Sequence, residues 1–358
     1  MGRELFYSEL KSFFGDVPLF IFPTNTYGGH EVMSLEIIKE LLSQGCSVKV
    51  AVEPENNKLI EELKIINPGN EVIILPIKQA RFEFLHAIFN LRKKIKAEKF
   101  MSMMMRHDFS STVIVQGDIE LGAIYVEAAK KIKMPFYSYI PYAHTAKKMG
   151  KKLAGLRDFY YPYVYRKVDN FITISNVFSQ ELQVYNQKCT TYIIKNKIRD
   201  ISHVINKRIE LADNRKDNTL RATVIGRVNF KQKGQDVLLK AIQAIPQNIR
   251  AQLVIDIIGN GPDLNSLKEK VSAMNLNNVF KFHDWCKEPW EIAFNNDLLI
   301  IPSRFEGVPL VMLEGLAIGI DIIATKADGM VDYLDDTMLF NDANELAHLL
   351  EMKIKNKK

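Results

Sequence analysis

Arg304-Phe-Glu-Gly-Val-Pro-Leu-Val-Met-Leu-Glu-Gly-Leu-Ala-Ile-Gly319 is the stretch of this chain that most clearly predicts its fold. It follows the apolar run Leu298–Ile301, and a short polar loop precedes a helical pattern, so we predict a strand, a loop and a helix. Pro309 suits the first turn of that helix because N–H groups there have no hydrogen-bond partner within the helix, so the one that proline lacks is not missed. The unpaired N–H groups of a helix start favour an anion such as a diphosphate, and Gly307 lets a ligand approach the backbone.

Two carboxylates accompany this predicted anion site. Glu306 lies in the loop before the helix and Glu314 lies inside it, with seven residues between them. We expect one carboxylate to contact sugar hydroxyls near the phosphate and the other to contact a ribose diol deeper in a cleft. The alternative is that Glu306 is a solvated loop charge and Glu314 a surface helix residue.

Fixed cations occur in a second strand, loop and helix, Val224-Ile-Gly-Arg-Val-Asn-Phe-Lys-Gln-Lys-Gly-Gln-Asp-Val-Leu-Leu239. Arg227 and Lys233 follow the carboxyl end of the predicted strand, where ligands of open α/β sheets bind. Two cations there would neutralise the charge on a departing nucleoside diphosphate, as a divalent metal does elsewhere. The alternative is a pair of surface charges beside a tight turn, and we prefer that reading for Lys231.

Strand-sized apolar runs alternate with amphipathic stretches along the whole chain, which is typical of an α/β protein with parallel sheets. A polar stretch over 206–218 separates two such arrays, so we predict two doubly wound domains facing across a cleft in preference to one eight-fold barrel. The predicted strands are Val17–Phe22, Ser47–Val52, Val72–Leu75, Thr112–Gln116, Pro135–Ile140, Phe171–Ile174, Leu220–Ile225, Leu253–Ile258, Val279–His283, Leu298–Ile301 and Asp321–Ala324.

Length and composition agree with two folded domains. The chain has 358 residues, 47% of them hydrophobic and 25% charged, which excludes intrinsic disorder. The formal net charge of +6 is too small for a dedicated nucleic-acid coat, so no nucleic-acid partner is expected. Cys46, Cys189 and Cys286 are far apart and form no C-x-x-C pair, so we predict no disulfide framework, no metal site and a reducing, cytoplasmic location. No signal peptide or membrane-spanning run is predicted.

The two motif segments, with Ile257-Ile-Gly-Asn-Gly-Pro-Asp-Leu264 between them, resemble the family 4 retaining glycosyltransferases of the GT-B fold. The resemblance is strong over residues 220–335. It is looser in the first half, through Tyr27-Gly-Gly-His-Glu-Val-Met-Ser-Leu, Tyr142-Ala-His144 and Ile172-Thr-Ile-Ser-Asn176. It implies two Rossmann-like domains: an acceptor-binding domain over 1–200 and a donor-binding domain over 201–345, followed by a basic C-terminal helix or tail over 346–358.

The same resemblance implies a role for each site residue. Arg227 and Lys233 would hold the donor diphosphate, Glu306 the transferred sugar and Glu314 the ribose. The remaining donor contacts would come from the backbone of Gly307 and Val308, the strand end at Phe282 and His283, the glycine loop of Gly28 and Gly29, and His144 from the opposite wall of the cleft. A lone histidine is as often structural, so a structural role for His144 stays open.

The implied reaction is a retaining, metal-independent transfer without a cofactor. The donor would be a UDP- or GDP-sugar and the acceptor a lipid-linked or growing cell-surface glycan. The leaving phosphate would itself help to accept the acceptor proton. The chain departs from the family at Lys195-Asn-Lys-Ile-Arg199, where the common asparagine–glycine turn has lost its glycine.

Positive charge gathers in the first half, at Arg92-Lys-Lys-Ile-Lys-Ala-Glu-Lys99 and Lys147-Lys-Met-Gly-Lys-Lys152. The second cluster runs into an aromatic stretch that ends at Tyr165. Such a surface can rest on anionic lipid headgroups, which favours peripheral association with the inner face of the plasma membrane. A solvated charged face beside an ordinary core helix is the alternative.

Three other functions are compatible with this fold. A nucleotide-sugar epimerase would use the same donor without an acceptor. A phosphorylase would need a pyridoxal-binding lysine environment, which we do not identify. A non-catalytic nucleotide-sugar or scaffold protein would have no need of Arg227, Lys233, Glu306 and Glu314 in this order.

Overall fold

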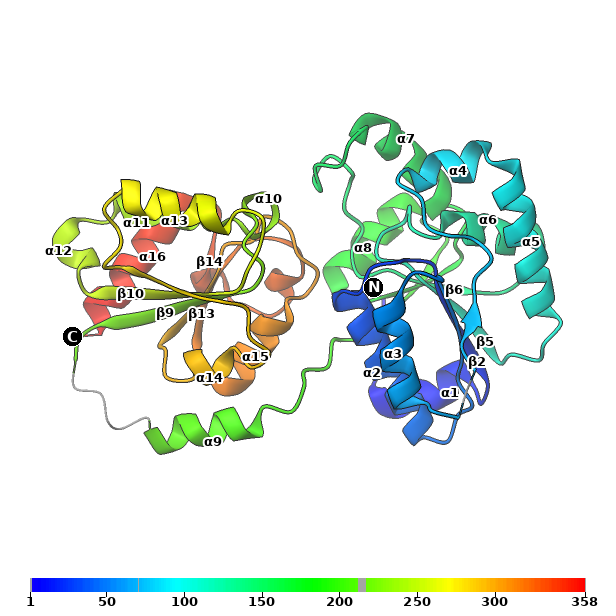
Figure 1. Cartoon of the computed structure of the whole chain (residues 1–358), viewed down its shortest axis with the longest axis horizontal. Helices are drawn as coiled ribbons and strands as arrows, with labels where there is room; N and C mark the ends of the chain where they lie inside the picture. The colour runs from blue at the N-terminus through cyan, green and yellow to red at the C-terminus, as the bar shows by residue number, and fades with distance from the viewer. Residues whose placement is uncertain (1, 70, 212–216, 358) are drawn as a thin grey trace. The chain divides into compact units, whose positions relative to one another are not determined.

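The computed structural model describes residues 2–69, 71–211 and 217–357 and divides into two compact units, Met1–Lys197 and Ile198–Lys358 (Figure 1). The sequence predicted a division between residues 200 and 201. Each unit is built on one parallel β-sheet with helices packed against it. The fold class predicted from the alternating pattern is thereby confirmed.

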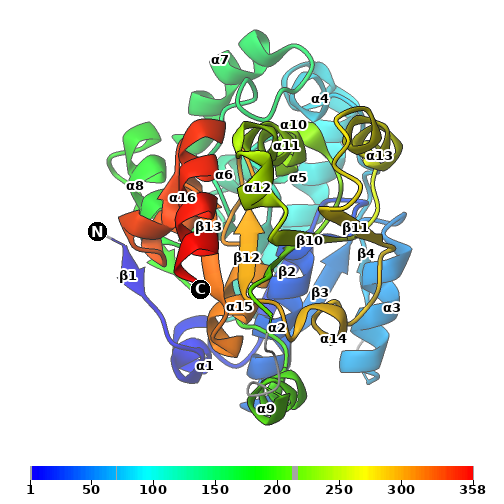
Figure 2. The same cartoon turned by 90° about the vertical axis from the view of Figure 1, so that its left-hand side faces the viewer.

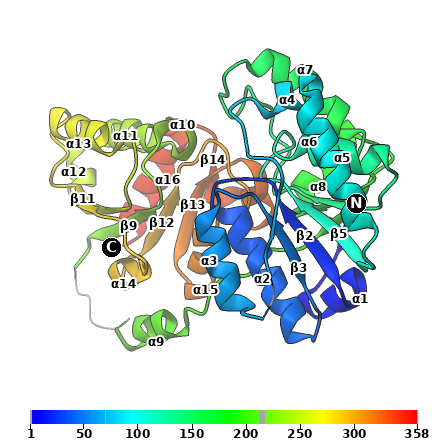
Figure 3. The same ribbon diagram turned by 45° about the vertical axis from the view of Figure 1, so that its right-hand side comes forward.

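Within the described residues, the sheet of the first unit has the strand order β1-β8-β7-β6-β5-β2-β3-β4, and its paired strands are parallel. Figure 3 shows β2, β3 and β5 running in the same direction. The chain proceeds from β2 outward to β3 and β4, then returns to place β5 on the other side of β2. The strands are β1 Arg3–Glu4, β2 Pro18–Phe22, β3 Lys49–Val52, β4 Ile73–Ile74, β5 Ser111–Val115, β6 Tyr137–Tyr139, β7 Asn170–Thr173 and β8 Thr190–Ile193.

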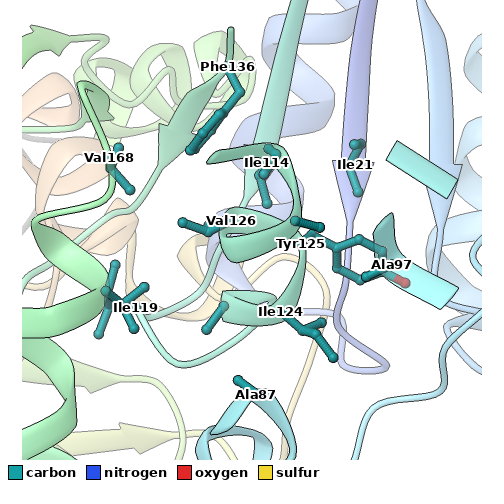
Figure 4. Close-up of a cluster of buried hydrophobic side chains, with 14 of the residues drawn as sticks. Ile21, Ala87, Ala97, Ile114, Ile119, Ile124, Tyr125, Val126, Phe136 and Val168 are labelled. Atoms are coloured by element: carbon teal, nitrogen blue, oxygen red, sulfur yellow. The ribbon is translucent and has the colours of Figure 1, made fainter. Parts of the chain in front are cut away.

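The core of the first unit forms around helix α6 (Ala123–Lys131). Its residues Ile124, Tyr125 and Val126 are buried among side chains from neighbouring helices and strands, which include Ala97 and Ile114 (Figure 4). The other helices are the 3₁₀ turn η1 Tyr7–Glu9, α1 Leu10–Phe14, α2 Gly29–Ser43, α3 Asn57–Ile66, α4 Glu83–Phe89, α5 Leu91–Met105, α7 Ala154–Tyr165 and α8 Asn176–Tyr185.

The sheet of the second unit has the order β11-β10-β9-β12-β13-β14 within the described residues. The chain runs from β9 outward to β10 and β11, and then crosses to place β12 on the other side of β9. This reversal makes the carboxyl ends of β9 and β12 a topological switch point, where open α/β sheets bind their ligands. The strands are β9 Leu220–Ile225, β10 Leu253–Ile258, β11 Phe280–His283, β12 Leu298–Ile301, β13 Asp321–Thr325 and β14 Leu339–Phe340.

Helices α16 (Ala343–Asn356) and α11 (Gln235–Ala244) lie side by side over the second sheet (Figure 2). Asp342 caps α16 by accepting hydrogen bonds from two backbone N–H groups. The predicted C-terminal tail over 346–358 is mostly this helix, which buries Leu346 and Leu350 in the core of the unit. Lys358 lies outside the described residues.

The polar stretch predicted over 206–218 lies partly in a helix. The structure places part of this stretch in helix α9, while residues 212–216 lie outside the described residues.

No helix in the described parts of the chain combines the length and apolar character needed to cross a bilayer. The remaining helices of the second unit are α9 Ser202–Leu211, α10 Phe230–Lys233, α12 Gln247–Arg250, α13 Leu264–Ala273, α14 Trp290–Ala293, α15 Leu310–Ile318 and the 3₁₀ turns η2 Asp328–Asp332 and η3 Asp336–Met338.

Candidate active site

Backbone-to-backbone packing shapes the switch point of the second unit. The loops after β9 and β10 touch, so that a Cβ on Gly259 would lie 2.1 Å from the carbonyl oxygen of Gly226, and one on Gly261 would lie 2.1 Å from that of Val228. Gly259 also has a φ of +145°, a backbone conformation that residues other than glycine rarely adopt. The G-x-G pair is therefore required by close loop packing.

Lys233 and Glu306, which are 73 residues apart in the chain, form an ion pair at this edge of the sheet. Lys233 ends α10, and Gly234 then turns the chain with a φ of +65°; a Cβ there would lie 1.9 Å from the carbonyl oxygen of Pro302. Glu306 follows β12, and its backbone N–H donates to Asp328 Oδ2 at 2.8 Å. The side chains are 23% and 11% exposed, so the pair is only partly screened by water. The structure thus brings together two of the predicted catalytic residues.

Arg227 lines a pocket of about 510 Å³, and a Cβ on Gly226, which also lines this pocket, would lie 3.9 Å from Lys233 Nζ of the ion pair. The pocket lies at the carboxyl ends of β9 and β10, where Gly226 and Gly259 line it with backbone atoms. Trp285, which is 73% exposed, and Cys286 also line it, from the segment after β11. A concave site that combines an aromatic ring, a guanidinium and open backbone can accommodate a nucleotide.

Glu314 is buried, which excludes the alternative that it is a surface helix residue. Its Oε2 accepts a hydrogen bond from Trp290 Nε1 at 2.7 Å, and its Oε1 accepts one from Arg199 Nε at 2.9 Å. Arg199 also lines the pocket and pairs with Glu288. Each carboxylate oxygen has a second lone pair, so Glu314 retains the capacity to accept hydrogen bonds from a diol.

Phe282 and His283, the predicted base contacts, have other neighbours in the structure, and their contact with a base stays a prediction. The ring of Phe282 lies under Lys268 Nζ, 5.5 Å from the ring centroid, and His283 Nε2 lies 2.7 Å from Asp256 Oδ1. Neither residue is among those that line the pocket, whose wall after β11 begins at Trp285.

The predicted anion-binding helix start also has well-defined neighbours. Helix α15 begins at Leu310, with Pro309 as its N-cap residue. Val308 is buried, and the carbonyl oxygen of Gly307 accepts a hydrogen bond from Gly329 N at 3.2 Å. These contacts hold the loop before α15 in one conformation.

In the first unit, Gly28 and Gly29 lie at the start of α2, beside the switch point between β2 and β5. The buried Glu31 organises this loop by accepting hydrogen bonds from Gly28 N and Thr24 Oγ1, both at 2.8 Å. Burial raises the pKa of Glu31, but the hydrogen bonds from His30, Thr24 and Gly28 outweigh burial and leave this pKa below its ordinary value. Glu31, three residues after the N-cap Gly28, thus supplies the carboxylate half of a capping box.

His144 is buried in the first unit, in the segment after β6. Its ring stacks on Tyr142 at a centroid distance of 4.8 Å and contacts the edge of Phe178 at 5.6 Å. These ring contacts fix its orientation and agree with a structural as well as a catalytic role. Arg227, Lys233, Glu306 and Glu314 thus belong to one unit and His144 to the other, and a site formed jointly by both units stays a prediction.

Three residues of this site were missed by the sequence reasoning: Trp285 and Arg199, which line the pocket, and Trp290, which donates to Glu314. Trp285 and Trp290 are the two tryptophans of the chain, and both closely follow β11. Arg199 lies where the chain departs from the asparagine–glycine turn. That departure was a signal, but nothing in the sequence paired Arg199 with a carboxylate 115 residues away.

Comparisons with known proteins agree with this geometry. Residues 206–356 match the family described as Glycosyl transferases group 1. The chain is 21% identical over 352 residues to an uncharacterized glycosyltransferase of Haemophilus influenzae, covering 95% of this chain and 90% of that protein. It is 29% identical over 116 residues to UDP-Gal:alpha-D-GlcNAc-diphosphoundecaprenol alpha-1,3-galactosyltransferase of Escherichia coli, covering 32% and 30% of the two chains.

The crystal structure of Anabaena Alr3699/HepE in complex with UDP superimposes with a TM-score of 0.70 at 15% identity, covering 96% of this chain and 91% of that one. At this identity the likeness shows the fold alone. The chain therefore has the two-unit parallel-sheet architecture of the GT-B glycosyltransferases, and the family match of its second unit supports glycosyltransferase activity.

Proposed function

We propose that the protein is a retaining, metal-independent glycosyltransferase that moves a sugar from a UDP- or GDP-sugar to a lipid-linked or growing cell-surface glycan. The observation that carries this proposal is the Lys233–Glu306 ion pair beside the Arg227 pocket, at the switch point of the second sheet. The cation can bind the donor phosphate while the neighbouring carboxylate accepts hydrogen bonds from sugar hydroxyls. In a nucleotide sugar the phosphate and the sugar are joined by one bond, so they too lie side by side.

The donor nucleotide fits the pocket of about 510 Å³. The exposed ring of Trp285 offers a stacking surface for the base, and Glu314 offers a carboxylate for the ribose diol. The UDP in the HepE structure and the UDP-Gal in the name of the Escherichia coli relative favour uracil as the base.

In the proposed reaction, the bond between the anomeric carbon and the diphosphate oxygen breaks while the acceptor hydroxyl oxygen bonds to that carbon on the same face. The acceptor proton passes to the leaving phosphate. Arg227 and Lys233 stabilise the charge that develops on this phosphate, Glu306 orients the sugar, and the start of α15 supplies backbone N–H groups. His144 would contact the donor sugar from the first unit.

The proposed acceptor is lipid-linked because the Escherichia coli relative acts, by its name, on a diphosphoundecaprenol-linked sugar. The transfer would take place at the inner face of the plasma membrane. An epimerase or a non-catalytic nucleotide-sugar protein would bind the same donor but would transfer no sugar.

Donor binding can be tested on the native chain through Cys286, which lines the pocket and is partly exposed, whereas Cys46 and Cys189 are buried. We expect UDP or a UDP-sugar to raise the melting temperature and to protect Cys286 from alkylation, with Cys46 and Cys189 as internal controls. Stabilisation by GDP alone would reassign the base. No stabilisation or protection by any nucleotide would refute the proposal.

Transfer itself is tested with UDP-sugars and a lipid-linked acceptor in the presence of EDTA. Retention predicts that the anomeric configuration of the donor sugar is preserved in the product, as read by NMR coupling constants. An inverted product would refute retention, and loss of turnover in EDTA would refute metal independence. Donor turnover that yields only an isomerised nucleotide sugar would indicate the epimerase.

A further inference from the structure

Helices α4 and α7, which are about seventy residues apart in the chain, lie next to one another in the first unit (Figures 1 and 3). An open groove of about 760 Å³ lies between them. Its walls are mostly apolar, with Phe84 and Phe89 from α4 and Leu156, Phe159 and Tyr163 from α7, and they also include Asp158 and Arg166. The sequence had indicated α7 as an aromatic stretch, but it did not indicate α4 as its partner.

The side chains around this groove are unusually exposed for their size. Phe159 is 87% exposed, Phe89 77% and Leu156 58%. Single exposed apolar residues are ordinary, but a contiguous apolar patch marks a surface that contacts another apolar phase. Helix α7 has two distinct sides, because Leu156, Phe159 and Tyr163 face outward at helical spacing while Tyr160 and Val164 are buried in the core.

Positive charge is concentrated in the sequence segments that form this groove and continue from it. The segments 81–99 and 147–167, which contain α4, most of α5 and α7, hold thirteen Lys and Arg and three Asp and Glu. Their net charge of +10 exceeds the +6 of the whole chain, so the rest of the molecule is net negative. Arg92, Lys147, Lys152 and Arg166 are exposed in these segments. Lys167 Nζ lies 4.3 Å from the centroid of the Tyr163 ring, which links charge and apolar surface directly.

Two cations of the same segments are instead used to anchor the surface. Arg157 is buried and forms an ion pair with Glu120, and Lys151 Nζ lies 2.5 Å from Asp118 Oδ2. Asp118 also accepts hydrogen bonds from two backbone N–H groups of its own turn. These contacts tie the basic loop and the start of α7 to the carboxyl edge of the sheet, so the outward residues are presented by a rigid support.

We propose that the α4–α7 surface, defined by Phe89, Leu156, Phe159, Tyr163 and the exposed cations around them, docks the first unit on an anionic lipid bilayer. The aromatic and aliphatic side chains enter the headgroup region, and the exposed Lys and Arg contact anionic headgroups. Charge complementarity selects this occupant over a second copy of the chain, because the exposed charges of these segments are mostly positive and two copies of the surface would repel one another. The purpose of docking, access to a lipid-linked acceptor, rests on the proposed function.

The contact can be measured without sugar transfer, by flotation of the full chain with vesicles. Vesicles of phosphatidylcholine with phosphatidylglycerol should carry the protein at low salt, and pure phosphatidylcholine should carry much less. The double variant Phe89→Ser/Phe159→Ser should lose roughly tenfold or more in partitioning, since each Phe contributes apolar burial. Lys147→Gln/Lys152→Gln should also weaken binding, and added salt should do the same.

Val184→Ser is the matched control, since Val184 is 80% exposed on α8 and does not line the groove. It should partition like wild type. Failure of the wild-type protein to bind anionic vesicles at low salt would overturn the proposal, as would equal binding by Phe89→Ser/Phe159→Ser. Concentration-dependent dimerisation that this double variant abolishes, without vesicle binding, would assign the surface to a second copy instead.

UDP protection of Cys286 separates this inference from the proposed function. Phe89→Ser/Phe159→Ser should retain wild-type protection of Cys286, and its buried Cys46 and Cys189 should stay unreactive, which shows that the first unit of the variant is folded. Vesicle binding without any nucleotide binding would leave the docking surface intact and refute the glycosyltransferase. Nucleotide binding without vesicle binding would refute the docking surface and leave the proposed function standing.

Discussion

Glu314 allows structural and functional roles to be separated by two substitutions at one position. Its Oε2 accepts the indole N–H of Trp290, which is completely buried, and its Oε1 accepts from the partly exposed Arg199. Glu314→Ala leaves the indole N–H without an acceptor, which should lower the unfolding free energy by about 1–3 kcal/mol. Glu314→Gln keeps an amide oxygen for the indole but loses both the charge and the hydrogen-bond acceptor that face Arg199. Because Arg199 is partly exposed and also pairs with Glu288, this loss should cost about 1 kcal/mol or less.

Urea unfolding followed by tryptophan fluorescence measures this difference in the relevant unit, because both tryptophans of the chain lie in the second unit. With a urea m-value of about 1–3 kcal/mol/M, the expected midpoint shift for Glu314→Ala is on the order of 1 M. Glu269→Gln, an exposed carboxylate change on α13, is the matched control and should leave the midpoint unchanged.

UDP titration of the same variants then tests the ribose role. A charge-assisted hydrogen bond contributes about 1.5–3 kcal/mol, so Glu314→Gln should bind UDP roughly 10–150-fold more weakly at nearly unchanged stability. Wild-type affinity in Glu314→Gln would refute the ribose contact. Wild-type stability in Glu314→Ala would refute the importance of the buried Trp290 hydrogen bond.

Three further predictions follow from other contacts. Lys233→Ala should lower sugar transfer by about 10²–10³-fold at unchanged fold, because it removes a cation from the leaving phosphate, and wild-type turnover would contradict this role. Gly261→Ala should lower the urea midpoint of the second unit by the equivalent of about 1–3 kcal/mol, since its Cβ would meet the Val228 backbone, and an unchanged midpoint would contradict this close packing. Because the folded-state pKa of Glu31 is lowered, its ionised form stabilises the native state above the unfolded-state pKa, and this contribution is lost as the pH falls through the folded-state value. The difference in unfolding free energy between wild type and Glu31→Gln should therefore shrink as the pH falls from about 6 to about 3, and a constant difference would show that the carboxylate is not responsible.

The sequence alone was sufficient for the class of fold and for most of the strands. β9, β10 and β12 lie where the apolar runs predicted them, because a strand buried in a parallel sheet is a continuous apolar run. The sequence also showed the G-x-G pair, because no other residue fits where two backbones pack this closely. Short edge strands such as β1 and β14, each of two residues, carry too little pattern to be recognised.

Side-chain partners depended on tertiary structure. Local pattern showed that Glu314 lies on a helix, but not that it is buried against Trp290 and Arg199, because neither partner is a neighbour in the chain. The same holds for the pocket of about 510 Å³, which residues as far apart in the chain as Arg199 and Trp285 line together.

The segment from Arg304 to Gly319 and its counterpart after β9 determined by themselves that this chain places cations and carboxylates at the carboxyl ends of parallel strands. Periodicity and spacing are properties of consecutive residues, so a sequence states them directly. Only the tertiary structure decided that Lys233 meets Glu306 and that α4 meets α7 to form an apolar groove within a basic surface. Those contacts join residues about seventy positions apart, and the path of the folded backbone alone determines which distant residues touch.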